Sequence, residues 1–169
     1  MPASNEPSCI VVADAGPLIA LGRIDAIGLL PRLFARIEVA ETVIAECLAR
    51  PDLPDATRES AAIQADWLTP CADVPGLVEA SIDAGVASSI ARARQAGIDL
   101  LMDDRAAVAF ARRAGLKVIG TLGVLILAKR RGLLDRIAPT IESLSAAGHY
   151  LSRSALQAAL VLGGEVKES

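Results

Sequence analysis

The chain has 169 residues, enough for one domain with a single hydrophobic core, and its longest apolar stretch, residues 118–128, is too short to cross a membrane. Hydrophobic residues make up 53% of the sequence and aromatic residues only 2%, a balance that favours aliphatic helices packed over an apolar sheet. Cys9, Cys47 and Cys71 are odd in number and far apart, which argues against a disulfide framework or a zinc site, and the net charge of −3 gives no general attraction to nucleic acid.

Strands that alternate with helices are predicted in the first part of the chain. Residues 1–8 lack a basic segment followed by an apolar one, so we expect a disordered N-terminal segment, no export signal and a cytoplasmic protein. The β-branched run at residues 9–13 predicts a strand, and Gly16 and Pro17 predict the N-cap and first residue of the next helix. The pattern continues with helices at 17–24 and 27–34, a strand at 36–40, and a helix whose apolar face holds Val43, Ile44, Cys47 and Leu48.

The middle of the chain is the least regular region, because Pro51, Pro54, Pro70, Pro75 and Gly76 interrupt it. We expect a helix at residues 55–65 there, followed by a loop. Regular alternation then returns, with a helix at 81–95, a strand at 99–102, a helix at 105–114 and a strand at 117–120. The remainder, from residue 121 onward, is predicted to be helical, with breaks at Pro139 and Gly148.

Short apolar strands between helices predict an α/β fold with a central, mostly parallel sheet flanked by helices and joined by right-handed crossovers. No repeat, low-complexity segment or long linker divides the sequence. We therefore expect a single domain over residues 9–165 and a short tail at residues 166–169.

Acidic residues follow the predicted strands. Asp14 comes directly after the first strand, Glu46 lies in the helix after the second, and Asp103 and Asp104 follow the strand at residues 99–102. Because ligands of open parallel sheets bind at the carboxyl ends of the strands, these acids are candidates for one site. Clustered carboxylates repel one another, and Mg²⁺ or Mn²⁺ relieves the repulsion. Metal ions held in this way can catalyse phosphodiester hydrolysis, which points to a nuclease acting on nucleic acid.

Each of these acids also has a simpler interpretation. Asp14, Asp103 or Asp104 alone would be an ordinary turn or cap residue, and Glu46 alone an exposed helix residue. Only their joint placement favours a metal site. The sequence contains neither a Walker-type phosphate loop nor a G-x-G-x-x-G turn, which argues against nucleotide triphosphates and dinucleotides as ligands. Three further residues, His149, Trp67 and Tyr150, are expected to be structural.

Three segments together resemble the PIN-domain proteins, in particular the subgroup related to toxin ribonucleases of prokaryotic toxin–antitoxin modules. They read VVADAGPLIALGRI, VAETVIAECL and LLMDDRAAVAFARRAGLKVIGTLGVLILAKRRGLL, and the similarity extends over residues 9–165. The resemblance implies a PIN-like three-layer fold and a Mg²⁺- or Mn²⁺-dependent endoribonuclease. Asp14 matches the family's first acid, Glu46 the second, and Asp103 or Asp104 the late acid, with Asp104 preferred as the metal ligand. Thr121 matches a polar position near the same site.

One departure from the family's pattern concerns the acidic site itself. The subgroup usually has a Glu in a Gly-Glu-Ala stretch, where this chain has Gly85-Val86-Ala87, and Val cannot coordinate a cation. Asp83 lies three residues earlier and is a candidate for a partial substitute. An Arg often found shortly after the acid pair is also replaced, here by Val108. Both departures predict altered or lost catalysis.

Two main functional hypotheses remain open. The first is a metal-dependent ribonuclease, and the family resemblance suggests that such an enzyme could be a toxin inhibited by a small antitoxin protein. The second is a PIN-fold module that binds RNA or protein without cutting. A phosphoacceptor receiver domain fits poorly, because its acid pair would follow the first strand. If RNA binds, Arg105, Thr121, Lys129 and Arg130 are the predicted substrate-binding residues, with a solvated helix face as the alternative for the Lys129–Arg131 cluster. The family resemblance further suggests a homodimer, and no membrane association is expected.

Overall fold

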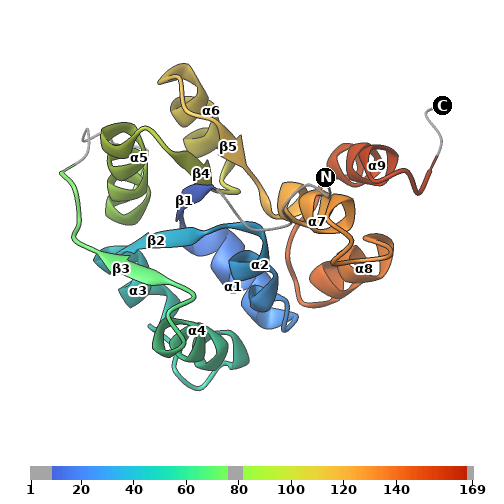
Figure 1. Cartoon of the computed structure of the whole chain (residues 1–169), viewed down its shortest axis with the longest axis horizontal. Helices are drawn as coiled ribbons and strands as arrows, with labels where there is room; N and C mark the ends of the chain where they lie inside the picture. Colours follow the sequence, from blue (N-terminus) through green and yellow to red (C-terminus); the bar gives the residue numbers. More distant parts are fainter. Residues whose placement is uncertain (1–8, 76–81, 167–169) are drawn as a thin grey trace, which may run out of the picture.

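The computed structural model describes residues 9–75 and 82–166, which fold around a five-stranded parallel sheet (Figure 1). The strands are β1 (Ile10–Ala13), β2 (Arg36–Ala40), β3 (Thr69–Cys71), β4 (Asp99–Leu101) and β5 (Val118–Ile119). Their order across the sheet is β3-β2-β1-β4-β5. The segment at residues 1–8 that was expected to be disordered, and residues 167–169 of the expected tail, lie outside the described residues.

Helices cover both faces of this sheet. They are α1 (Ala15–Arg23), the short 3-10 helix η1 (Ile27–Leu29), α2 (Leu30–Leu33), α3 (Glu41–Cys47), α4 (Pro54–Gln64), α5 (Ala84–Ala96), α6 (Arg105–Arg113), α7 (Thr121–Arg130), α8 (Ala138–Ala146) and α9 (Arg153–Leu162). On the central strand β1, Val12 packs with Leu100 and Met102 against α5 and α6. Val11 and Ala13 face the other layer, which contains α1, α2 and α7. The predicted α/β architecture, a sheet between two helical layers, is confirmed.

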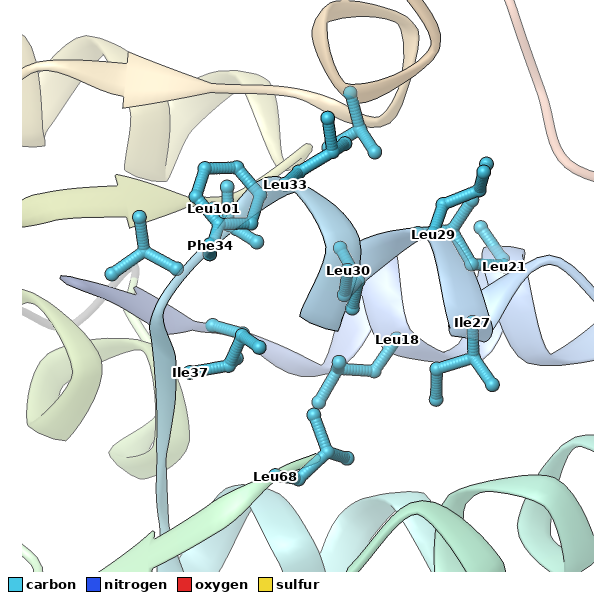
Figure 2. Packing of buried hydrophobic residues seen from close by; sticks show 14 of the residues in the cluster. Leu18, Leu21, Ile27, Leu29, Leu30, Leu33, Phe34, Ile37, Leu68 and Leu101 are labelled. Carbon is cyan, nitrogen blue, oxygen red and sulfur yellow. The ribbon is translucent and has the colours of Figure 1, made fainter. Parts of the chain in front are cut away.

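The layer on the α1 side holds most of the apolar core. Leu18 and Leu21 of α1 pack with Leu30 and Leu33 of α2, and each of these side chains is at most 2% exposed (Figure 2). Burying one such side chain contributes about 1.5–3 kcal/mol. Because α1 is held this firmly, the position of Asp14, directly before the helix, is fixed by the core.

The structure corrects two details of the sequence analysis. Helix α1 begins at Ala15, so Gly16 is not the N-cap; Pro17 is tolerated inside the first turn because its missing N–H has no partner there. Strand β3 was predicted as loop, and its Pro70 is compatible with pairing because β3 lies at the edge of the sheet. Among the described residues, no helix is long and apolar enough to cross a membrane.

Candidate active site

The carboxyl ends of β1 and β4 meet at the centre of the sheet, where the strand order reverses. From β1 the chain proceeds to β2 on one side and later returns to β4 on the other. The backbone N–H of Asp14 donates to the carbonyl of Leu101 at 2.9 Å, which extends the pairing of β1 and β4 as far as the first acid. Open α/β sheets bind their ligands at this point of the topology.

A cleft of about 250 Å³ opens at this position, and four carboxylates line it. They come from the end of β1, from α3, and from the first residues before α5 and α6. The lining residues are Asp14, Ala15, Gly16, Glu46, Ile82, Asp83, Val86, Asp104 and Ala107. The structure thus brings Asp14, Glu46 and Asp104 to one cleft, as the sequence analysis expected, and adds Asp83.

Asp14 is the most enclosed of the four acids, with only 6% of its surface exposed. The pKa of Asp14 is raised to about 6, chiefly because burial disfavours the charged form, and the nearby carboxylates of Glu46 and Asp83 add repulsion. The hydroxyl of Ser89 opposes this shift by donating a hydrogen bond to Asp14 Oδ1 at 3.2 Å. A buried acid with a raised pKa at the end of a strand is typical of functional sites.

Glu46 and Asp83 lie on either side of Gly85. A Cβ atom placed on Gly85 would be 3.5 Å from Asp83 Oδ1 and 3.5 Å from Glu46 Oε2, so the two carboxylate oxygens are separated by at most twice that distance. Burial, followed by repulsion from Asp83, raises the pKa of Glu46. A side chain at position 85 would contact both acids, and its Cβ atom would lie 3.3 Å from Val43 Cγ2.

The adjacent acids Asp103 and Asp104 cap two different helices. Asp104 accepts a hydrogen bond from the backbone N–H of Ala107 at 2.8 Å, which caps α6 while the carboxylate lines the cleft. Asp103 turns toward α7 instead, where it accepts from the backbone N–H of Thr121 at 2.7 Å and from the Thr121 hydroxyl. Asp104 therefore both caps α6 and lines the cleft, whereas Asp103 links the loop after β4 to the start of α7.

Two predicted substrate-binding residues are occupied by contacts within the protein. Thr121 is fully buried and bound to Asp103. The ammonium group of Lys129 donates to Glu165 at 2.8 Å, and Glu165 also accepts from the backbone N–H groups of Ile137 and Ala138. Thr121 and Lys129 thus hold α7 to its neighbours.

The other two predicted substrate-binding residues, Arg105 and Arg130, are exposed to solvent. Arg105 begins α6 immediately after Asp104, beside the cleft, whereas Arg130 lies at the far end of α7. The position of Arg105 therefore suits a substrate phosphate better than that of Arg130.

The donor atoms of the cleft suit a hard divalent cation, because the charged groups that line it supply carboxylate oxygens. Among residues 9–75 and 82–166, however, no three His, Cys, Asp or Glu side chains are close enough together to form a metal-binding group as they stand. Repulsion among the carboxylates opposes their closer approach, and a bound cation would remove it. Coordination would thus require the side chains of Glu46, Asp83 or Asp104 to rotate toward Asp14.

Val86 occupies the position at which the sequence analysis found an acid missing. Its side chain lines the cleft and packs into the smaller core, 7% exposed. Its backbone N–H donates to Asp83 Oδ1 at 2.8 Å, which makes Asp83 the N-cap of α5. The signal for this role was present in the sequence, since an Asp directly before a helix, accepting from the N–H three residues later, is an ordinary N-cap.

A comparison with protein families agrees with this architecture. A family model described as a PIN domain matches residues 10–165. No curated protein matches the sequence significantly. Among solved structures, a PilT N-terminus domain protein from the hyperthermophilic archaeon Sulfolobus solfataricus P2 is similar, with a TM-score of 0.48 and 12% identity over 85% of this chain and 98% of that chain.

Proposed function

The chain belongs to the PIN-domain family, and from this premise we propose that it is a metal-dependent endoribonuclease that hydrolyses phosphodiester bonds of RNA. PIN domains are generally nuclease folds, and the carboxylate-lined cleft at the centre of the sheet is the observation that carries the proposal. An acidic cleft repels RNA by itself, so binding of the substrate phosphate there needs a cation between the two.

Asp14, Glu46, Asp83 and Asp104 would hold Mg²⁺ or Mn²⁺, in place of the three ligands expected from the sequence. Such an ion supplies a water activated for attack and stabilises charge on the phosphate. Asp14, the buried acid, would bind the ion from the rigid end of β1, and the hydrogen bond from Ser89 orients its carboxylate. Asp103 is a positioning residue in this proposal, because it ties the loop after β4 to the start of α7. Arg105 is placed to contact a phosphate of the substrate.

The test is titration of Mn²⁺ into the protein by calorimetry, compared with Asp14→Asn and Asp104→Asn variants. Asn at position 104 can still accept the hydrogen bond that caps α6, so this variant removes charge with little effect on the helix. We expect both variants to weaken Mn²⁺ binding roughly tenfold or more. Asp52→Asn, in an exposed loop, is the matched control and should bind like the wild type. Unchanged binding in both site variants would refute a shared metal site.

Cleavage of a labelled RNA in Mn²⁺ and in EDTA then tests the reaction itself. A metal-dependent product ladder that Asp14→Asn abolishes supports the endoribonuclease. Binding of metal without cleavage supports the second candidate, a PIN-fold module that binds RNA or protein, which the apolar side chain of Val86 in the cleft favours. Val86→Glu separates the two, because a large gain in cleavage means that only the missing acid limits an otherwise competent site.

The biological setting is a further part of the proposal. The resemblance to toxin ribonucleases suggests a toxin inhibited by a small antitoxin protein, and a homodimer in the cytoplasm. Co-expression of the chain with its genomic neighbour, followed by growth and pull-down measurements, tests the antitoxin. Sedimentation equilibrium of the purified protein tests the dimer.

A further inference from the structure

The short connection between α8 and α9 has a backbone fixed at both ends. At the end of α8, Gly148 adopts a left-handed conformation with φ of 83°, and the N–H of His149 donates to the carbonyl of Leu144 at 3.0 Å. At the start of α9, the Ser152 hydroxyl accepts from the N–H of Ala155 at 3.2 Å. The residues in between are therefore held in place on both sides.

Two side chains of this connection point into the protein. The imidazole Nε2 of His149 lies 3.7 Å from Asp103 Oδ2, and Leu151 packs against the main core. Both anchor the connection, which agrees with the expected structural role of His149. The residue between them, Tyr150, points outward and is 87% exposed.

Tyr150 differs in exposure from the other aromatic residues of the chain. Phe34 is buried, Phe110 is half-buried, and Trp67 is 40% exposed with its ring against Gly28. A tyrosine that is 87% exposed contributes little to packing, so its expected structural role is wrong. Its ring is available to a partner.

The connection also lies beside the acidic cleft. A Cβ atom placed on Gly16, which lines the cleft, would be 3.6 Å from Asp103 Cβ, and Asp103 in turn faces His149. Tyr150 follows His149 directly, which places it within a few residue lengths of the cleft. Arg153, the first residue of α9, is exposed and forms no ion pair with the described residues.

We propose that Tyr150 is a stacking platform for an unpaired base of RNA whose backbone passes through the acidic cleft. The proposal rests on the function proposed above. Unpaired bases expose their faces to aromatic rings, whereas bases in a duplex are already stacked. Arg153 supplies a positive charge for the adjoining phosphate.

Binding of labelled oligouridylate in Ca²⁺, followed by fluorescence anisotropy, tests this assignment. Calcium also prefers carboxylate oxygens and is used here to populate the site. We expect Tyr150→Ala to raise the dissociation constant roughly five- to hundredfold, and Tyr150→Phe to preserve it, because the ring alone stacks. Leu162→Ala, another exposed apolar residue of the C-terminal region, is the matched control and should leave binding unchanged. An oligouridylate–oligoadenylate duplex should bind Tyr150→Ala as it binds the wild type.

A second measurement detects the contact directly. Tyr150→Trp in a Trp67→Phe background places the only tryptophan at position 150, because the chain contains one Trp. Oligouridylate should quench its emission, whereas the emission of Trp67 in the wild type should not change. Absence of quenching, or wild-type affinity of Tyr150→Ala, would overturn the assignment, as would a wild type that binds no RNA.

The outcomes also separate this inference from the nuclease proposal. Wild-type cleavage that Tyr150→Ala retains at the same affinity refutes the stacking platform and leaves the nuclease standing. RNA binding that depends on Tyr150, without cleavage, supports the stacking platform and refutes the nuclease. Dissociation of a dimer by Tyr150→Ala, with RNA binding unchanged, would place Tyr150 in a protein interface and overturn the assignment.

Discussion

Replacing Asp14 by Asn should stabilise the protein in the absence of metal while weakening its response to metal. Asp14 is buried against two other carboxylates, and its pKa is raised from 3.8 to about 6. The folded protein therefore holds a proton at this position more tightly than the unfolded chain does. An Asn side chain has nearly the same shape, can still accept the hydrogen bond from Ser89, and carries no charge at any pH.

The size of the effect follows from linkage between protonation and folding. Between pH 3.8 and about 6 the folded state binds more protons than the unfolded state, so the stability of the wild type falls as the pH rises through this window. A shift of about two units corresponds to about 3 kcal/mol, all of which is lost above pH 6. We expect Asp14→Asn to match the wild type near pH 4 and to exceed it by about 3 kcal/mol at pH 7.5.

Urea unfolding in EDTA at several pH values measures this difference. Addition of Mn²⁺ at about one hundred times the wild-type dissociation constant should then raise the stability of the wild type by about 2.7 kcal/mol, and that of a variant with tenfold weaker binding by only about 1.4 kcal/mol. A difference between the two proteins that does not vary with pH would refute the reasoning, because it would mean that the charge of Asp14 is not disfavoured in the folded state. Asp52→Asn is the control for a charge change at an exposed position.

Two other buried or tethered carboxylates lead to pH-dependent predictions. Glu59 is 1% exposed; burial, and then repulsion from Asp55, raises its pKa to about 8. Glu59→Gln should therefore match the wild type near pH 4.5 and be more stable by about 3–5 kcal/mol at pH 8.5 in urea unfolding, whereas parallel pH profiles would contradict this. For Glu165, the hydrogen bond from Lys129 lowers the pKa to about 2, so its contribution is present above pH 4.5 and is lost as the pH falls toward 2. Glu165→Gln should lower the melting temperature at pH 7 but not near pH 2, and an equal loss at both values would rule out the ionic contribution.

The sheet was predictable from the sequence because its strands are short, apolar and separated by helical patterns. The segment at residues 36–40 was predicted with the bounds of β2, and residues 9–13 include β1. Strand β3 was missed because it has only three residues, one of them Pro70, and pairs along one edge only. Such a strand is specified by its neighbour β2 more than by its own sequence, since strand propensity depends on context.

The cleft was only partly predictable. Parallel strands bring their carboxyl ends to one edge, so an acid directly after a strand, such as Asp14, could be placed from the sequence. The roles of Thr121 and Lys129 could not, because they depend on Asp103 and on Glu165, which is 36 residues away from Lys129. The sequence shows a polar residue at a suitable position, but it does not show the distant partner to which that residue is already bound.

The apolar residue in the cleft does not merely remove an acid from the site. Val86 contributes no ligand through its side chain, yet its backbone N–H holds Asp83 Oδ1, and Asp83 lies beside Glu46 in the same cleft. Any residue other than proline at position 86 would keep this hydrogen bond, because the backbone donates it. A glutamate there would add a further negative charge close to Asp14, whose pKa is already raised. Without the charge of a glutamate at position 86, the cleft attracts a cation less strongly, and the carboxylates of the metal-free protein repel one another less. Metal affinity and metal-free stability should therefore change in opposite directions when position 86 is varied.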